Sequence, residues 1–289
     1  MLKRRKRLPC LSGLVLLAGA LLVAPVEAMP KRVMSLNLCT DQLAMTLAEP
    51  GQLVSVSFLA REPSLSMLHE KAQGYPVNHG LAEEVFLENP DLVVTGTYSL
   101  HNTTALLKRL GFHVEEFSFA QTLETIPGEI RRMGALIGQE KKAETIANDF
   151  DSELKAIAAR QCGKHPTMIA YDQNGIASGR GTLADSVMQA AGFINLAAEM
   201  GIVGVAPFPL EQVIAAQPDV INMSTPQTAP TLGEYVPRHP AIAALPQTRV
   251  GAFVPEGSLS CGTPLVIKAV RALAALRSTI APCPESAAP

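Results

Sequence analysis

The sequence of 289 residues contains no tryptophan, and aromatic residues make up only 4% of it. Any aromatic surface for a ligand must therefore be built from tyrosine and phenylalanine. Signatures of several enzyme classes are missing too: there is no GxSxG nucleophile elbow, no HExxH motif and no phosphate-binding GxxxxGK[ST] loop. A secreted hydrolase that uses a nucleophile from SLSCGTP (258–264) stays an alternative, although no motif brings a histidine near that segment. We expect a protein that is not an enzyme and has no resident cofactor.

The first 28 residues have the pattern of a cleavable export signal. Lys3–Arg7 are all basic, an apolar run covers 11–23, and small residues at 26–28 suit signal peptidase. The apolar run is too short to cross a bilayer, which needs about 20 residues. We predict a periplasmic protein whose mature chain starts near Met29, exported by either the Sec or the Tat route.

Basic charge is also scarce in the mature chain. Removal of residues 1–28 leaves 261 residues, with 19 basic and 25 acidic side chains. This length suits one large or two medium domains. The acidic balance excludes the basic footprint of a nucleic-acid-binding protein and argues against binding to anionic membranes. No second apolar run is long enough to cross a membrane.

Short β-rich runs alternate with helical patterns, which is typical of parallel sheets in an α/β fold. A first series of strands is expected at 32–36, 53–57, 91–96 and 113–117, with a helix at 103–111. A second series has strands at 167–171, 219–223 and 249–254, with helices at 182–192 and 264–276.

Two further helices, 127–138 and 140–160, are expected between the two series. The longer one carries an apolar stripe at spacings of three and four, and its roughly 20 residues would reach about 30 Å. We therefore predict two α/β lobes with mostly parallel sheets joined by a single long helix. The expected divisions are a signal peptide at 1–28, an N-terminal lobe at 29–125, bridging helices at 126–162 and a C-terminal lobe at 163–289.

The two series echo each other. LAEEVFLENPDLVV (81–94) and FPLEQVIAAQPDVIN (208–222) both place a glutamate seven residues before a Pro-Asp pair and an apolar strand. Two related lobes that face each other create a cleft, which is a usual place for a ligand.

Seven segments in order resemble the periplasmic substrate-binding proteins of ABC importers for ferric siderophores, haem and vitamin B12. KRVMSLNLCTDQLAMTLAE (31–49) is similar to the family pattern RIVSLxPxxTExLxxLG, and GLAEEVFLENPDLVV (80–94) to NLExIxxLKPDLVI. The other five are LLKRLGFHV (106–114), MGALIGQEKKAETI (133–146), VMQAAGFIN (187–195), PLEQVIAAQPDVIN (209–222) and HPAIAALPQTRVGAFV (239–254). The resemblance runs from residue 31 to about 277.

The resemblance implies a monomer that captures a metal chelate, either a ferric siderophore or a corrinoid such as vitamin B12, between its lobes. The partner would be an inner-membrane ABC permease with its ATPase. In the family, a surface glutamate on each lobe docks onto the permease, and Glu83 and Glu211 occupy those positions, although Glu84 lies beside the first. Without the family, each would be a solvated charge at a helix start. The absence of tryptophan departs from the vitamin B12-binding members and leaves the choice of chelate open.

A zinc- or manganese-binding protein of related fold stays an alternative. It would need several histidines and carboxylates around one ion, and His69 and His79 of the first lobe are its candidates.

In open α/β sheets, ligands bind beyond the carboxyl ends of the strands. The candidate ligand-binding residues in such loops are Ser35, Asn37, Cys39, Phe58, Arg61, Tyr98, Tyr171, Arg180, Ser260 and Cys261. The arginines would meet the carboxylates or catecholates of an anionic chelate, and the aromatic side chains would pack on a flat ligand. Thr40 or Asp41 is expected to cap the helix that follows the first strand.

Four cysteines in the mature chain allow three pairings. The family places Cys39 and Cys261 in cleft loops, one on each lobe, where they would contact the ligand or bind metal as thiolates. A disulfide between them would hinder opening, so we do not expect it. Cys162 and Cys283, at the start and end of the second lobe, are the more plausible disulfide.

Overall fold

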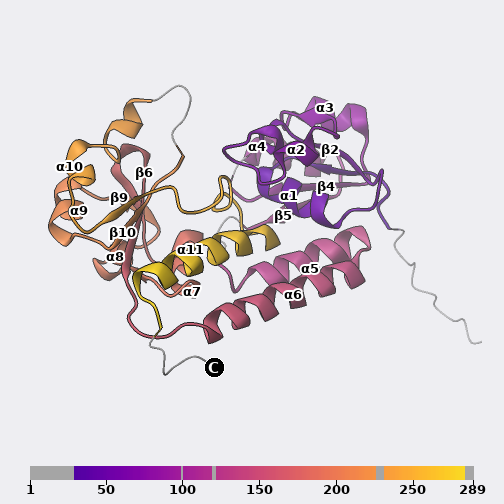
Figure 1. Cartoon of the computed structure of the whole chain (residues 1–289). Helices are drawn as coiled ribbons and strands as arrows, with labels where there is room; N and C mark the ends of the chain where they lie inside the picture. The colour runs from indigo at the N-terminus through magenta and orange to yellow at the C-terminus, as the bar shows by residue number, and fades with distance from the viewer. Residues whose placement is uncertain (1–28, 99, 119–121, 226–230, 284–289) are drawn as a thin grey trace, which may run out of the picture.

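The N-terminal lobe is built around a five-stranded parallel sheet. The computed structural model describes residues 29–98, 100–118, 122–225 and 231–283, so the expected export signal lies outside the described residues (Figure 1). The sheet has the order β3-β2-β1-β4-β5 and every neighbouring pair is parallel. Its strands are β1 (Val33–Ser35), β2 (Leu53–Ser57), β3 (Val77–Asn78), β4 (Leu92–Gly96) and β5 (Val114–Phe117). The helices that accompany them are α1 (Leu38–Leu47), α2 (His69–Ala72), α3 (Ala82–Glu88) and α4 (His101–Arg109), with a 3-10 turn η1 (Phe58–Arg61).

The C-terminal lobe has a mixed sheet of order β11-β10-β6-β7-β9, in which β8 also pairs with β6. β6, β8, β10 and β11 are parallel, whereas β7 and β9 run antiparallel to their neighbours. The strands are β6 (Thr167–Asp172), β7 (Ile176–Ser178), β8 (Ile194–Asn195), β9 (Val205–Pro207), β10 (Val220–Asn222) and β11 (Arg249–Gly251). The helical elements are η2 (Gln173–Gly175), α7 (Leu183–Ala190), α8 (Leu196–Glu199), α9 (Leu210–Ala216), η3 (Leu232–Tyr235), α10 (Pro240–Ala243) and η4 (Pro264–Val266).

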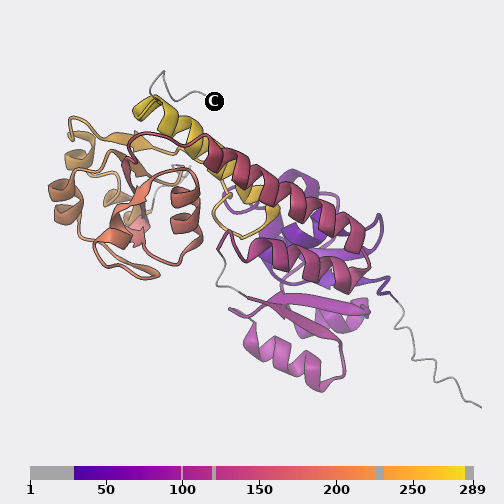
Figure 2. The same ribbon diagram turned by 90° about the horizontal axis from the view of Figure 1, so that it is seen from below.

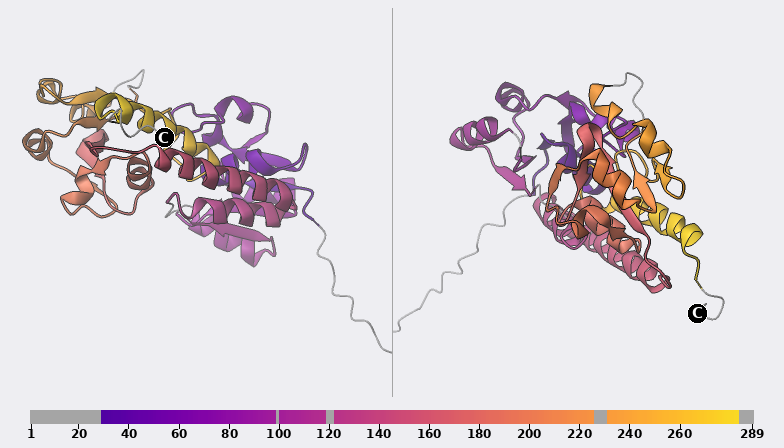
Figure 3. Two further views of the ribbon diagram at one scale, coloured as in Figure 1. Left: turned by 60° about the horizontal axis from the view of Figure 1, so that its bottom comes forward. Right: turned by 90° about the vertical axis from the view of Figure 1, so that its left-hand side faces the viewer.

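Long helices connect the lobes. α5 (Ile126–Ile137) packs along α6 (Glu140–Ala159), the predicted bridging helix of 20 residues, and α11 (Ile267–Ile280) also packs against α6. Figure 2 shows α6 and α11 running side by side from one lobe to the other, and Figure 3 shows the same bridge from two further directions. The predicted fold class is therefore confirmed, with α11 added to the bridge.

The apolar core continues from one lobe to the other. One cluster of buried side chains includes Val33 of the first sheet, Ile130 of α5, Phe150 of α6, Met168 of the second sheet and Leu273 of α11. Lobes that share a large apolar interface move less freely than lobes joined by a loose linker. The bridge therefore favours small relative motions of the lobes.

The echo between the two halves of the sequence is a repeated structural unit. α3 and α9 each have seven residues and end in a left-handed residue, Asn89 or Gln217, both with φ of 44°. In the Pro-Asp pair that follows, Asp91 accepts hydrogen bonds from two backbone N–H groups just before β1, at 2.7 and 2.9 Å. Asp219 accepts one from the N–H of Thr167, at the start of β6, at 2.7 Å. The motif thus fastens the central strand of each sheet beside its neighbour.

The predicted strands of the first series and the first two of the second are present with their ends shifted by at most one residue, while β11 is three residues shorter than expected. The strands that were not predicted are β3, β7, β8 and β9, which have two or three residues each. The segment YDQNGIASGRG (171–181), which holds the predicted loop residues Tyr171 and Arg180, contains η2 and β7. Within the part of the chain that the structure describes, no helix combines the length and apolarity that crossing a membrane requires.

Candidate functional site

The loop between β1 and α1 is a capped helix start. The side-chain oxygen of Asn37 accepts a hydrogen bond from the N–H of Cys39 at 2.9 Å, so Asn37 is the N-cap and the prediction of Thr40 or Asp41 was wrong. Ser35 is fully buried and its hydroxyl lies 2.8 Å from that of Thr40. Its predicted contact with a ligand is therefore corrected, because the hydroxyl faces the protein interior.

Asp41 fixes the end of the neighbouring strand. It is fully buried, and its carboxylate accepts hydrogen bonds from the N–H of Ser57 at 3.0 Å and from the Ser57 hydroxyl at 2.5 Å. Burial raises its pKa from the ordinary 3.8 to about 7, although hydrogen bonds from serine side chains and the Ser57 backbone act in the opposite direction. Ser57 directly precedes Phe58, a candidate ligand-binding residue. Asp41 therefore fixes the backbone position from which Phe58 extends.

A disulfide joins Cys39 to Cys261, with their Cα atoms 5.2 Å apart. Our expectation that these cysteines would not pair was wrong, and so was a thiolate role. The physical reason is that the segment after β11 crosses to the first lobe before η4 begins. Gly257 packs so closely there that a Cβ atom on it would lie 2.8 Å from the backbone of Leu65. The disulfide therefore fastens this crossing segment, including the exposed Ser260, to the start of α1.

The second disulfide, Cys162 with Cys283, confirms the pairing considered more plausible, and its Cα atoms are 5.5 Å apart. All four cysteines of the described residues are thus oxidised. Among the described residues, no group of three or more His, Cys, Asp or Glu side chains is placed to hold a metal ion. His69, one candidate for a bare-metal site, has its Nδ1 3.0 Å from the carbonyl oxygen of Ser66.

An aromatic pair lies where β2 and β3 end. Phe58, which is 43% exposed, stacks on His79 with ring centroids 5.3 Å apart and an interplanar angle of 21°. The neighbouring Asn78 anchors this corner, since its amide donates to the Ser35 carbonyl at 2.9 Å and to the Ser55 hydroxyl at 2.8 Å. His79 was not among the predicted chelate-binding residues, because a strand of two residues leaves almost no sequence pattern.

The other ligand-binding candidates of the first lobe, Arg61 and Tyr98, differ in how exposed they are. Arg61 donates to the carbonyl oxygens of Tyr75 at 2.6 Å and Ala72 at 3.4 Å, so its guanidinium holds the chain after α2. Tyr98 follows β4 and is 69% exposed. The candidates that present exposed or partly exposed side chains at the carboxyl edge of the first sheet are therefore Asn37, Phe58, Arg61 and Tyr98.

Two candidates of the second lobe are corrected by the structure. Tyr171 is only 1% exposed, and its hydroxyl donates to the carbonyl oxygen of Phe208 at 3.0 Å, so it belongs to the core. Burial and the negative charge of Glu211 raise its pKa. Arg180 follows β7, which runs antiparallel to β6, so the chain returns towards the amino end of β6. Arg180 therefore lies away from the carboxyl edge, and it donates to the Ala198 carbonyl at 3.3 Å.

Other polar side chains occupy that edge of the second sheet. The Ser224 hydroxyl, just after β10, lies 2.5 Å from the carboxylate of Asp172 at the end of β6. Arg238 donates to the Ser224 carbonyl at 3.2 Å and pairs with the buried Glu234 at 3.3 Å. Arg238 was missed because only the three-dimensional path between η3 and α10 brings it to β10.

The two candidate docking glutamates occupy matching positions. Glu83 lies in the first turn of α3 and Glu211 in the first turn of α9, and both are exposed. Glu84 instead accepts hydrogen bonds from the N–H groups of His79 at 2.9 Å and Leu81 at 3.0 Å. Partial burial acts to raise the pKa of Glu84, but these hydrogen bonds and the His79 side chain outweigh it and lower the pKa. Of the adjacent pair, Glu83 is the side chain available at the surface.

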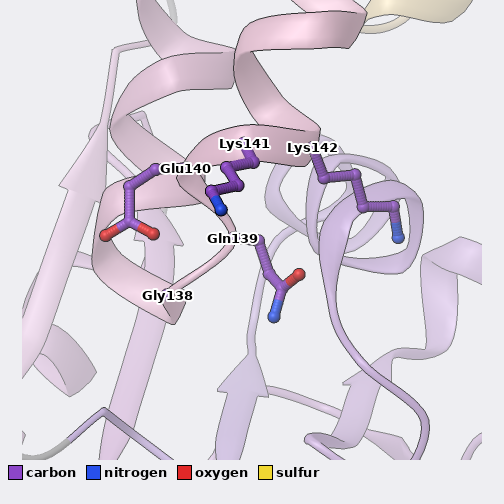
Figure 4. Close-up of a pocket in the computed structure, with 5 residues that line it drawn as sticks. All are labelled: Gly138, Gln139, Glu140, Lys141 and Lys142. Carbon is purple, nitrogen blue, oxygen red and sulfur yellow. The ribbon is translucent and has the colours of Figure 1, made fainter.

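Two concavities are lined by residues other than the predicted ligand-binding ones. One of about 270 Å³ is formed by Gly138, Gln139, Glu140, Lys141 and Lys142 at the turn between α5 and α6 (Figure 4). Another of about 160 Å³ lies beside β3 and α3. Neither includes a predicted ligand-binding residue, so the candidate site consists of the strand ends and not of these hollows.

Two α/β lobes with a repeated helix–Pro-Asp–strand unit, bridged by long helices, define a class of two-lobed binding proteins. The chain belongs to the periplasmic binding protein family, whose model matches residues 33–253. It is similar to a cobalamin-binding protein of Halobacterium salinarum, with 26% identity over 201 residues that cover 68% of this chain and 54% of that protein. It thus spans about half the length of that relative. A vitamin B12-binding protein of Pectobacterium carotovorum subsp. carotovorum is 26% identical over 216 residues, covering 71% of this chain and 75% of that protein.

Solved structures share the fold. The haem-binding protein RhuT from Roseiflexus sp. RS-1 superposes with a TM-score of 0.68 and 24% identity, covering 85% of this chain and 96% of RhuT. The vitamin B12-binding protein BtuF of Vibrio cholerae gives a TM-score of 0.64 at 20% identity, with coverages of 85% and 96%. At these identities, the likeness is one of fold.

Proposed function

We propose that this protein is the periplasmic substrate-binding component of an ABC importer, and that it captures a metal chelate and delivers it to an inner-membrane permease. The observation that carries the proposal is the matched pair of lobes, each with an exposed glutamate in the first turn of a seven-residue helix. The named relatives, which bind cobalamin, vitamin B12 or haem, support a chelate as the ligand class.

Capture takes place between the carboxyl edges of the two sheets. Phe58 and His79 supply aromatic surface on the first lobe, and Tyr98 adds an exposed ring at the end of β4. On the second lobe, Asp172, Ser224 and Arg238 supply polar groups for the ligand's periphery. Because a continuous core and the Cys39–Cys261 disulfide connect the lobes, closure on the ligand is small.

Delivery depends on two surface carboxylates held at a set separation. Glu83 and Glu211 dock onto basic residues of the permease, and the bridge of α6 and α11 keeps their spacing nearly constant. A rigid spacing lets the permease recognise both lobes together, as two linked contacts bind more tightly than either alone. The protein acts as a monomer, without catalysis, after removal of the export signal.

The test is to purify the mature protein undenatured from periplasm, record its ultraviolet–visible and mass spectra, and titrate it with cobalamin, haemin and ferric siderophores. Saturable binding of one of these chelates at a ratio of one to one is the expected result. Binding of Zn²⁺ or Mn²⁺ alone would replace the chelate with a bare metal. If neither chelates nor ions bind to folded protein, the proposal is wrong.

A further inference from the structure

The two disulfides are interleaved along the chain. Cys39 pairs with Cys261, 222 positions later, while Cys162 lies between them and pairs with Cys283, 121 positions further on. Neither bond joins two cysteines that follow each other in the sequence, where the order is Cys39, Cys162, Cys261 and Cys283. The two earlier cysteines therefore have no native partner until the two later ones have been synthesised.

The path of the chain after β11 causes this interleaving. The chain crosses to the first lobe, where Gly257 packs against the backbone of Leu65 and Cys261 meets the start of α1. α11 then runs back along α6 to the second lobe (Figure 2), where Arg277 donates to the backbone carbonyl of Cys162. One segment thus supplies the partners of both earlier cysteines, and it is synthesised after both lobes' sheets.

A bond between the two earlier cysteines is incompatible with this fold. The two native disulfides lie at opposite ends of α11, because Cys261 precedes this helix and Cys283 follows it. The 14 residues of α11 span about 21 Å, whereas a disulfide needs Cα atoms within about 7 Å of each other. A bond between Cys39 and Cys162 would pull the two ends of the bridge together. It would therefore exclude the packing of α11 on α6 and the closing of the shared core.

The order of synthesis favours this wrong bond when an unfolded chain enters the oxidising periplasm. Cys39 and Cys162 arrive first, and each is the only cysteine of the mature chain that the other can meet until Cys261 follows. The roughly 100 residues between Cys162 and Cys261 take about 5–20 s at a synthesis rate of about 5–20 residues per second. Disulfide formation with an efficient oxidant takes seconds, so the interval is long enough for the wrong bond to form.

We propose that this chain is a substrate of a periplasmic thiol–disulfide isomerase, which converts a bond between Cys39 and Cys162 into the native pairs. The isomerase thiolate attacks the Cys162 sulfur to form a mixed disulfide, and Cys39 leaves as a thiolate. Cys283 gives up its proton, which Cys39 takes, and attacks the same Cys162 sulfur, so the native bond forms and the isomerase thiolate is released. The thiols of Cys39 and Cys261 then lose two electrons and two protons to the disulfide of a thiol oxidase, which becomes a dithiol. This partner is separate from the ligand and the permease of the proposed function.

The experiment compares expression in a Gram-negative host that has, or lacks, its periplasmic disulfide isomerase. The wild-type chain is tested beside two double variants, Cys39→Ser with Cys261→Ser and Cys162→Ser with Cys283→Ser. Each double variant keeps one native pair in the mature chain and so has a single possible pairing, which makes it a matched control. Free thiols are blocked at harvest, folded periplasmic protein is quantified, and mass spectrometry of unreduced peptides identifies the disulfides.

We expect the yield of folded wild-type protein to fall several-fold in the host without the isomerase, and peptides joined through Cys39 and Cys162 to appear there. Each double variant should give the same yield in both hosts. Because the comparison for each variant is between hosts, a lower intrinsic stability of the variant does not affect it.

Two results would overturn the inference. One is native pairing of the wild type at equal yield in both hosts, as expected of a chain that folds before export. The other is an equal loss of all three proteins without the isomerase, because the isomerase would then act without regard to cysteine pairing. Both results leave chelate capture standing, since titration of the native protein tests it separately.

Discussion

Cys39 and Cys261 lie 222 positions apart in the sequence, yet their disulfide holds the Cα atoms 5.2 Å apart. One belongs to the first turn of α1 and the other to the segment that leads from the second sheet into η4. The bond therefore closes a loop that contains β2 to β11 and the α5–α6 bridge, and only β1 of the two sheets lies outside it. Together with the shared apolar core, the disulfide restricts how far the two lobes can move apart.

Replacement of both residues, Cys39→Ser with Cys261→Ser, should lower the free energy of unfolding by about 2–5 kcal/mol, because the unfolded chain regains the entropy of a long loop. Urea unfolding monitored by circular dichroism measures this. The comparison is Cys162→Ser with Cys283→Ser, which removes the disulfide that closes a shorter loop of 121 positions. Equal stability of the Cys39/Cys261 variant and the wild type would show that the disulfide has no such role.

The buried Asp41 should make stability depend on pH near neutrality. Its pKa in the folded protein, about 7, lies above the ordinary 3.8, so the folded state holds this proton more tightly than the unfolded state. The resulting stability is fully present below about pH 4 and is lost as pH rises through 7, by up to about 4 kcal/mol at 1.36 kcal/mol per pKa unit.

Asp41→Asn mimics the protonated form, since its amide can still accept from the Ser57 N–H and donate to the Ser57 hydroxyl. We expect this variant to lose the decline in stability between pH 5 and 8 and to be more stable than the wild type at pH 8. Asp149→Asn, on the exposed face of α6, is the control. Urea unfolding at several pH values measures the free energy of unfolding. If this free energy falls with rising pH as steeply in Asp41→Asn as in the wild type, the prediction is wrong.

Tyr171→Phe should reduce stability and leave ligand affinity unchanged. The variant removes the hydroxyl that donates to the buried carbonyl of Phe208, and a buried carbonyl without a partner costs about 1–3 kcal/mol. Thermal unfolding measures the loss, and titration with the bound chelate measures affinity. A marked loss of ligand affinity in a folded Tyr171→Phe protein would show that the Tyr171 hydroxyl takes part in ligand binding.

Charge reversal at both docking positions, Glu83→Lys with Glu211→Lys, should abolish uptake in cells and leave ligand affinity within about twofold, since both side chains are exposed in the first turn of their helices. Uptake assays with labelled ligand and titration of purified protein separate the two effects. Glu124→Lys with Glu199→Lys changes the same net charge at two other exposed positions and should transport normally. Uptake by the Glu83/Glu211 variant at the wild-type rate would exclude the docking role.

Much of the architecture was predictable because its signals are local. Short β-rich runs mark β2, β4 and β6, which have five or six residues each, and the three- and four-residue spacing in 140–160 marks α6. The strands β3, β7, β8 and β9 were missed because two or three residues carry no periodicity, and their pairing partners define them. The error at Arg180 followed from one of these, because β7 reverses the chain and carries Arg180 to the far edge of the sheet.

The residues of the candidate site were less predictable than the fold. Asn37, Phe58, Arg61 and Tyr98 came from the general rule that strand ends bind ligands, and their roles stay predictions. The rule cannot say which way a side chain points, so Ser35 and Tyr171 were placed at the ligand although they are buried. His79 acquires its significance only from contacts with Phe58 and Glu84, which come from separate elements.

The sequence by itself determined the α/β class, the two-lobe plan with its repeated Pro-Asp unit and the bridging helix, because periodicity and turn chemistry act over a few residues. Tertiary structure alone decided the pairing of Cys39 with Cys261, the burial of Tyr171 and the presentation of His79. Each depends on where distant segments cross, and such crossings are set by the packing of the shared core as a whole.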